Sequence, residues 1–210
     1  MKQWIQILFI MLVVVLSGCR SQEQKALFSD LNHQITNQNA CNINNETLTN
    51  LISTETAIYN EIIEKGFDSF EDISPLLEEG KKNVEESSKY LNDYQTCILQ
   101  NQINEQMVTE EINLIKDPII KQATEELVTK YVQYEASLNE YVESLLTLNE
   151  AEALFYNEVN ETTTISKLDE LMTKMNTAIE NAQMNYLTHQ ESLADFNSSY
   201  ISYYEKYMRS

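Results

Sequence analysis

Three long segments whose apolar residues recur at every seventh position constrain the fold more than any other feature of the chain. In the segment from residue 70 to about 115, one row is Phe70, Leu77, Val84, Leu91 and Ile98, and the companion row is Ile73, Gly80, Ser87 and Tyr94. Paired rows of this kind form the seam along which helices pack, and the small Gly80 and Ser87 would let a neighbour approach closely. The pattern fails at Asn101 and Glu105 and partly resumes at Met107, Ile112 and Ile115.

The other two segments repeat the scheme. From residue 119 to about 156 the rows are Ile120, Leu127, Tyr134, Tyr141, Leu148 and Phe155, and Tyr131, Leu138 and Leu145. From residue 165 onward they are Ile165, Met172, Ile179, Tyr186, Leu193, Tyr200 and Tyr207, and Leu168, Met175, Ala182, His189, Phe196 and Tyr203. At 1.5 Å per residue each segment would form a helix roughly 60–70 Å long.

Short breaks separate these segments, at Asp117-Pro118 and at residues 157–163. Because short connections between helices of similar length favour antiparallel neighbours, the sequence predicts an all-α fold, an elongated, coiled-coil-like antiparallel three-helix bundle. With only three Gly and two Pro, the chain has little of the turn chemistry that sheets need. A homomeric coiled coil built from separate chains is the alternative.

Two shorter helices are expected before the first long segment and packed alongside the bundle. Residues 24–37 place Leu27, Leu31 and Ile35 on one stripe, and residues 45–65 do the same with Leu48, Leu51, Ile58 and Ile62. Gly66 stands where a helix end favours a residue that tolerates positive φ. An Asn-rich break lies between the two helices.

The N-terminus resembles the signal of a bacterial lipoprotein. Lys2 precedes an apolar run of about twelve residues, which is shorter than the ~20 that span a membrane, and the run closes on the lipobox-like Leu16-Ser17-Gly18-Cys19. We therefore expect residues 1–18 to be a cleaved signal peptide, Cys19 to carry acyl chains (palmitate), residues 19–23 to be a tether and residues 24–210 a single helical domain. The chain would then lie on the extracytoplasmic face of the cell membrane. A plain secretory signal or an uncleaved anchor is the alternative.

The chain is strongly acidic, with a formal net charge of −19. Loss of residues 1–18, which hold Lys2 and no acid, would change this to −20. So acidic a body is repelled by phosphates, anionic headgroups and anionic wall polymers, which excludes nucleic acid as a partner. Divalent cations and cationic partners remain compatible with the charge.

No residue pattern indicates catalysis or a cofactor. The two histidines, His33 and His189, fall on different predicted helices, and neither a paired-histidine zinc motif nor a calcium loop is present. We interpret His189 as a seam residue and the acidic doublets as solvated helix faces. The chain also has no G-x-S-x-G and no recognisable Cys/His pair, so we expect a protein that is not an enzyme and binds no metal.

Cys41 and Cys97 are candidates for a disulfide, which an exported chain can keep. If the chain turns back at residues 65–67, Cys97 lies ~46 Å along the outgoing helix, and the path back to Cys41 covers ~44 Å. The two reaches agree, so a Cys41–Cys97 bridge is geometrically allowed. Two free thiols are the alternative.

Four tyrosines crowd the last turns of the chain: Tyr200, Tyr203, Tyr204 and Tyr207. Tyrosine suits half-buried places where the ring packs and the hydroxyl stays wet, so these residues could form a binding patch for wall glycans or a protein. Alternatively, Tyr200, Tyr203 and Tyr207 continue the seam and only Tyr204 points elsewhere.

One stretch carries a family resemblance. The run Glu55-Thr56-Ala57-Ile58-Tyr59-Asn60-Glu61-Ile62-Ile63-Glu64-Lys65-Gly66-Phe67-Asp68-Ser69-Phe70, between a lipobox and long helices, resembles the YkyA-like cell-wall-binding lipoproteins of Gram-positive bacteria. The resemblance implies a helical surface lipoprotein and brings no catalytic residues. The chain departs from the family in its richness in Asn, Thr and Tyr and in having Cys41 and Cys97, which leaves any shared ligand undetermined.

Two classes of function follow. The first is a non-enzymatic envelope protein that binds peptidoglycan or another envelope protein through a helical surface. The second is a ligand- or metal-carrying lipoprotein of the solute-binding kind, although the strand and Gly-rich signals of its usual two-lobed α/β body are missing. A hydrolase is a distant third.

Overall fold

The structure, a computed structural model, describes residues 22–41, 45–67 and 69–209. All regular elements in this part of the chain are helices: α1 (Gln22–Ala40), α2 (Asn45–Lys65), α3 (Phe70–Gln100), α4 (Glu105–Leu114), α5 (Pro118–Glu158), α6 (Ile165–Tyr203) and a closing π-helical turn, η1 (Tyr204–Met208). The predicted all-α class is confirmed. None of the described helices combines the length and the apolar character needed to cross a membrane.

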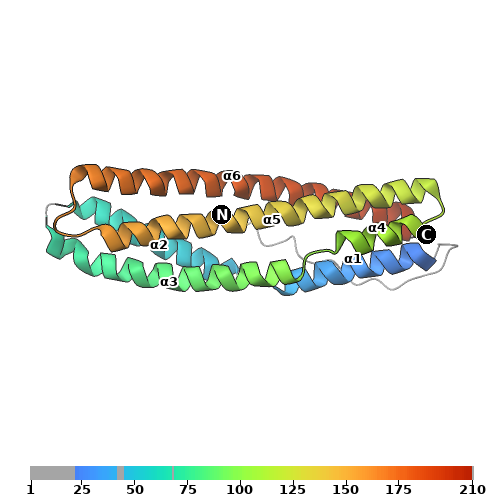
Figure 1. The fold of residues 1–210 in the computed structure, drawn as a ribbon, viewed down its shortest axis with the longest axis horizontal. Helices are drawn as coiled ribbons and strands as arrows, with labels where there is room; N and C mark the ends of the chain where they lie inside the picture. Colours follow the sequence, from blue (N-terminus) through green and yellow to red (C-terminus); the bar gives the residue numbers. More distant parts are fainter. Residues whose placement is uncertain (1–21, 42–44, 68, 210) are drawn as a thin grey trace.

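The helices form a rod, along which α5 and α6 run antiparallel from end to end (Figure 1). With 41 residues, α5 is ~60 Å long. In one half of the rod α2 and α3 pack against α5 and α6, and one core cluster joins Ile62, Leu77, Phe155 and Leu171 of these four helices. In the other half α1 packs on the same pair through Leu31, Leu127 and Phe196, with Val108 of α4 alongside.

The rod therefore differs from the predicted three-helix bundle. The first long segment is not one helix of full length, because α3 ends at Gln100 and α4 begins only at Glu105. The side chain of Asn104 caps α4 by accepting a hydrogen bond from the backbone N–H of Met107 at 3.1 Å. The break lies where the seven-residue pattern fails, at Asn101, and α1 takes a place in the second half of the rod.

The helix ends follow local chemistry. Asp117 accepts hydrogen bonds from the N–H groups of Ile119 (2.9 Å) and Ile120 (3.2 Å), and Pro118 occupies the first helical position of α5. Thr164 caps α6 by accepting from Lys167 N at 3.2 Å. Gly66 ends α2 with a φ of 73°, the left-handed conformation that the sequence predicts there.

The predicted seams are confirmed in α3 and only half right in α6. In α3 the residues Leu77, Val84, Leu91 and Ile98 are buried, as is Gly80, against which the Tyr156 ring packs. In α6 the row Met175, Ala182, His189, Phe196 and Tyr203 is buried. Its companion row is only partly right: Tyr200 is buried, but Ile165 and Tyr186 of the predicted row are exposed, and Leu171 and Ala178 beside this row are buried instead. The flank that packs inward carries smaller residues, which permit closer approach, while the more apolar flank is partly left at the surface.

Candidate functional site

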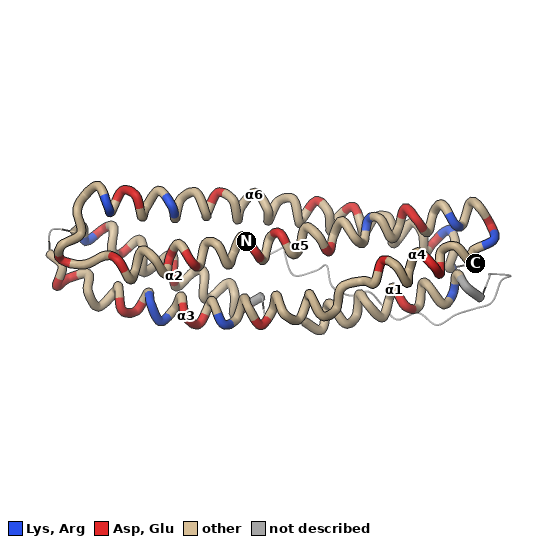
Figure 2. Tube along the Cα trace, in the orientation of Figure 1, with Lys and Arg blue, Asp and Glu red and all other residues tan. Residues whose placement is uncertain are grey.

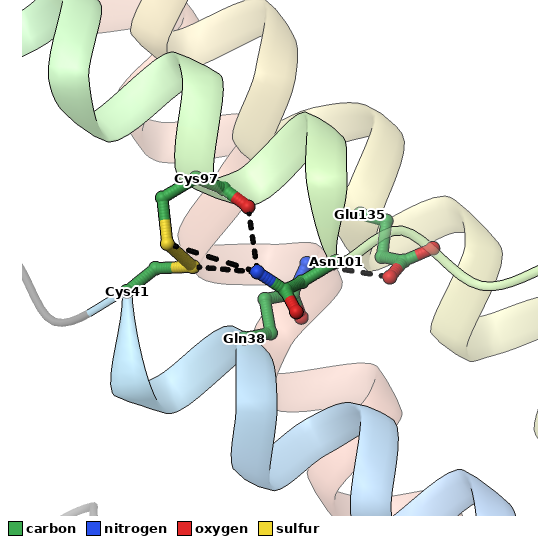
Figure 3. The surroundings of a disulfide bond; sticks show 5 residues. All are labelled: Gln38, Cys41, Cys97, Asn101 and Glu135. Atoms are coloured by element: carbon green, nitrogen blue, oxygen red, sulfur yellow. Dashed lines mark hydrogen bonds between the residues drawn. A yellow bond between two sulfur atoms is a disulfide. The ribbon is translucent and has the colours of Figure 1, made fainter.

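A disulfide joins α1 to α3 (Figure 3). The ends of these two helices meet near the middle of the rod (Figure 1). Cys41 follows the last residue of α1 and Cys97 lies in the last turn of α3, with 5.5 Å between their Cα atoms and 2.16 Å between the sulfurs. The side-chain amide of Asn101 donates to the carbonyl of Cys97 at 2.9 Å and contacts Cys41 Sγ at 3.4 Å. On this side of the rod α3 covers one half and α1 covers the other, so the bridge links the two halves of the bundle.

A buried carboxyl group, Glu135 of α5, lies next to this bridge. Its oxygens accept hydrogen bonds from the backbone N–H of Ile103 at 3.2 Å and from Gln38 Nε2 at 3.3 Å, while the Tyr131 hydroxyl donates to Gln38 Oε1 at 3.0 Å. Burial raises the pKa of Glu135 to about 7. The group thus connects α1, the α3–α4 turn and α5, and it acts as a structural crosslink.

A second buried polar cluster lies in the other half of the rod. Glu55 of α2 accepts hydrogen bonds from the Tyr156 hydroxyl and from Asn83 Nδ2, the latter at 3.0 Å. Burial, followed by the charge of Glu55, raises the pKa of Glu152 to about 8. Paired carboxyl groups with raised pKa values can serve acid–base catalysis, but the partners of Glu55 are side chains that hold α2, α3 and α5 together.

The histidines form no metal site. His189 is buried in the α6 seam, stacked on Tyr141 with ring centroids 6.0 Å apart, and burial lowers its pKa to about 4. Its Nδ1 lies 3.4 Å from Ser137 Oγ. His33 lies on α1 and His189 on α6. Among the described residues no group of three or more His, Cys, Asp or Glu side chains could hold a metal ion.

The four C-terminal tyrosines divide into two pairs. Tyr200 and Tyr203 are buried against Phe28 of α1, with stacked rings at 5.3 and 5.8 Å, as the seam interpretation expects. The Tyr203 hydroxyl also lies 2.8 Å from Thr124 Oγ1 and accepts from Gln24 Nε2 at 3.3 Å. Tyr204 and Tyr207 are half-buried at the end of the rod. A contiguous patch of four exposed rings is therefore absent, and Cys19 lies outside the described residues.

The side of the rod formed by α5 and α6 carries a shallow groove. Its lining residues are Glu140, Glu143, Ser144, Thr147, Asn181, Met184 and Asn185. Neither α5 from residue 131 to 158 nor α6 from residue 175 to its end at Tyr203 contains a Lys or Arg. The carboxylates of Glu140 and Glu143 consequently have no cation within these stretches to neutralise them.

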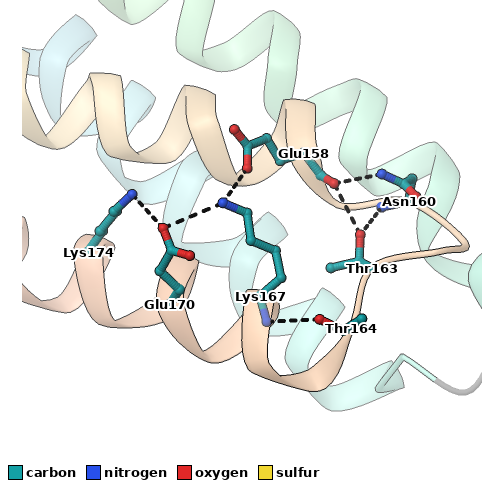
Figure 4. Close-up of polar contacts among 7 residues, drawn as sticks. All are labelled: Glu158, Asn160, Thr163, Thr164, Lys167, Glu170 and Lys174. Atoms are coloured by element: carbon teal, nitrogen blue, oxygen red, sulfur yellow. Dashed lines mark hydrogen bonds and ion pairs between the residues drawn. The ribbon is translucent and has the colours of Figure 1, made fainter.

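Ion pairs flank this stretch at both ends. At the α5–α6 turn Lys167 pairs with Glu158 at 2.7 Å and Lys174 with Glu170 at 2.8 Å, next to a loop closed by Asn160 and Thr163 (Figure 4). Toward the other end Lys130 pairs with Asp195 at 3.1 Å. The acidic groove between them is thus set apart from the charge-compensated surface.

Sequence reasoning missed both the buried acids and the groove. Glu55 and Glu135, which are buried, and Glu152, which is half-buried, have the sequence context of solvated acids, because nothing in their spacing marks them as inward-facing. The groove depends on which sides of α5 and α6 meet, and the predicted rows of α6 describe the inward-facing side only in part. The absence of Lys and Arg from these parts of α5 and α6 was the one sign of the acidic groove that the sequence contains.

Comparison with known proteins identifies one family. The family model described as "Putative cell-wall binding lipoprotein" (YkyA) matches residues 22–206, nearly the whole chain. No curated protein and no solved structure matches the chain. The likeness of the run from Glu55 to Phe70 to this family is thereby confirmed. The matched region contains all the helices described above except the last residues of η1, so the chain belongs to the YkyA family.

Proposed function

We propose that the chain is a non-enzymatic, lipid-anchored protein of the extracytoplasmic face, which binds the cell wall or a wall-associated protein along the side of its rod. The observation that carries this proposal is the family match over residues 22–206, whose description names both the wall and a lipoprotein. The all-α rod adds a surface suited to binding. It offers no support for a solute carrier, since no α/β lobe occurs among the described residues.

An anchor at Cys19 would orient the rod. Helix α1 begins at Gln22, only three residues later, and Gln24 contacts Tyr203 near the end of α6. Three extended residues reach about 10 Å at most. The end that carries the start of α1, the α4–α5 turn and η1 would therefore lie near the membrane, and the α2–α3 and α5–α6 turns would lie at the far end (Figure 1).

The charge of the body favours an upright rod. A chain with a net charge of −19 is repelled by an anionic leaflet, and this repulsion acts on any arrangement that lays the rod along the membrane. An upright rod would carry the far end ~60 Å outward, the length of α5. Its long sides would then face the material of the wall.

The α5–α6 groove is the surface we assign to the partner. Glu140 and Glu143 line it without a neighbouring cation, and Met184, 59% exposed, provides an apolar contact at its edge. Carboxylates without internal partners favour a ligand that carries amino groups, as both wall peptides that are not crosslinked and basic protein segments do. The groove therefore suits such a partner better than the α5–α6 turn, where the lysines are already paired with glutamates.

Site-specific photocrosslinking in intact cells tests this function. A photoreactive residue in place of Met184 should give an adduct, whereas the same residue in place of Leu99, 51% exposed on α3, should give little. Muramidase digestion before electrophoresis would separate a wall adduct, which collapses to small products, from a protein adduct. Equal crosslinking from Met184 and Leu99 would argue against binding through the α5–α6 side.

A further inference from the structure

The turn between α4 and α5 exposes large apolar side chains at one tip of the rod. Leu114, the last residue of α4, is 59% exposed, and Ile119, in the first turn of α5, is 66% exposed. Lys116 and Lys121 flank them, and Lys121 Nζ donates to Asn113 Oδ1 at 2.8 Å, which holds the turn. This tip thus presents apolar side chains beside positive charges.

The charge of this tip is opposite to that of the molecule. The segments that meet there are residues 22–26, 113–122 and 204–209, and they contain Lys25, Lys116, Lys121, Lys206 and Arg209 against Glu23, Asp117 and Glu205. Five of the 14 basic residues and only three of the 33 acidic residues therefore gather at one end of a chain of net charge −19. Figure 2 shows basic positions at the end that carries the C-terminus.

Half-buried aromatic residues complete the tip. Tyr204 and Tyr207 lie in η1, and the ammonium group of Lys206 stands 4.8 Å from the centroid of the Tyr207 ring. Tyrosine and lysine are the side chains that favour the boundary between lipid and water, where a ring meets headgroups and an ammonium group meets phosphate. These two tyrosines belong to the four that the sequence singled out as a binding patch.

The opposite tip has an exposed apolar residue without this charge. Ile165, in the first turn of α6, is 88% exposed, but the neighbouring Lys167 and Lys174 are paired with Glu158 and Glu170. Lys116, by contrast, forms no ion pair with any described residue. Of the two tips, the one where α1 begins therefore combines exposed apolar side chains with a lysine that forms no ion pair.

We propose that this tip, formed by the α4–α5 turn and η1, is a membrane-contacting surface that seats on anionic phospholipid. The occupant follows from charge complementarity and from the short distance along the chain between Cys19 and Gln22, which only two residues separate. Apolar insertion combined with attraction to anionic headgroups is how peripheral surfaces bind bilayers. The proposal relies on the proposed function only for the anchor that brings this tip to the membrane.

Vesicle sedimentation of the chain from Arg20 onward, which keeps every described residue but lacks Cys19, tests the tip without the anchor. We expect sedimentation with vesicles of phosphatidylcholine and phosphatidylglycerol, weaker sedimentation with phosphatidylcholine alone, and release by added salt. Lys116→Gln should lower the partition coefficient about fivefold. Ile119→Gln should lower it as well, because it removes the exposed apolar side chain.

Two matched variants provide the controls. Ile165→Gln alters an isoleucine that is at least as exposed, in the first turn of the other long helix, and Lys89→Gln alters an exposed lysine on α3; both should bind vesicles like the parent chain. Thermal unfolding should be the same for all four variants, since each side chain is exposed. Absence of binding to anionic vesicles, or equal losses in the tip and control variants, would overturn the proposal.

Purified walls separate contact with lipid from contact with wall polymer. If Lys116→Gln and Ile119→Gln weaken sedimentation with purified walls and leave vesicle binding unchanged, the tip contacts wall polymer and the proposal is wrong. Lipidation at Cys19 is read separately, by labelling the full chain and a Cys19→Ser variant with a palmitate analogue in cells. Failure of the tip and failure of the anchor are therefore distinguishable.

Discussion

Gly80 marks a close approach of two helices in the bundle. A Cβ atom added there would overlap the ring of Tyr156, which is fully buried. At an open helical position Gly→Ala stabilises by about 1 kcal/mol, whereas overpacking a filled core costs about 1–3 kcal/mol. We predict that Gly80→Ala lowers the free energy of unfolding in urea, and that Ser87→Ala in the same row changes it little. Stabilisation by Gly80→Ala would contradict the packing described.

Two acids, the buried Glu135 and the half-buried Glu152, make the stability of the fold depend on pH. Burial raises the pKa of Glu135 to about 7 and of Glu152 to about 8, from an ordinary value of 4.5. A carboxyl group with a raised pKa binds its proton more tightly in the folded state, so its stabilising contribution is lost as pH rises through the folded pKa. His189, with a pKa lowered to about 4, is neutral in the folded protein at the pH values where these carboxyl groups titrate.

The unfolding free energy should therefore fall as the pH rises from 6.5 to about 9. Above pH 6.5 His189 is mostly neutral in the unfolded chain as well as in the fold, so the two carboxyl groups dominate, and by about pH 9 both are ionised in the folded protein. In denaturant titrations Glu152→Gln should flatten this decline, and the exposed neighbour Glu150→Gln should leave it intact. An unchanged slope in Glu152→Gln would show that this carboxyl group does not titrate as its burial requires.

The close approach at Gly80 could be predicted from the sequence, whereas the burial of the glutamates could not. A glycine in a heptad row is unusual enough to indicate close approach. A glutamate in a helix is ordinarily solvated, so the burial of Glu55 and Glu135 could not be foreseen from one sequence. Their burial depends on partners from other helices, Tyr156 and Gln38, which no local pattern brings together.

At the scale of elements, the disulfide holds α1 to the rest of the rod. Cys41 and Cys97 are 56 residues apart, and closing a loop of that size contributes about 4 kcal/mol in the chain-entropy model. We predict that reduction, or Cys97→Ser, lowers stability by that order and raises hydrogen exchange in α1 first, while α5 and α6 stay protected. Reductant should have no effect on Cys97→Ser.

Thiol titration of the denatured protein provides the direct check on the bridge. Without reductant no thiol of the Cys41 and Cys97 pair should react, and with reductant both should. Two reactive thiols without reductant would contradict the bridge and remove the link between the halves of the rod.

The seven-residue pattern predicted where the helices lie better than how they face one another. The boundaries at Gly66 and Asp117-Pro118 depend on local backbone chemistry and were predicted correctly. The inward face of α6 depends on which neighbours it meets. Small residues such as Ala178 pack inward because α5 approaches closely, although Ile179 beside it is more apolar.

At the scale of the whole molecule, the rod has two different ends and one distinctive side. The end with Lys116 and Ile119 is basic and apolar, the α5–α6 turn carries ion pairs, and the groove between α5 and α6 carries carboxylates without a neighbouring cation. The overall acidity was predicted from composition, but its uneven distribution was not, because it depends on segments far apart in the sequence meeting at one tip.

The most direct test of this arrangement is the height of each end of the rod above the bilayer. Fluorophores introduced through unnatural amino acids at Ile119 and Ile165 would be measured on the lipidated protein in a supported bilayer by energy transfer to membrane dye. With the rod upright, position 165 should lie about 60 Å farther from the membrane than position 119. Equal heights, or position 165 nearer the bilayer, would contradict a rod anchored and seated by the end where α1 begins.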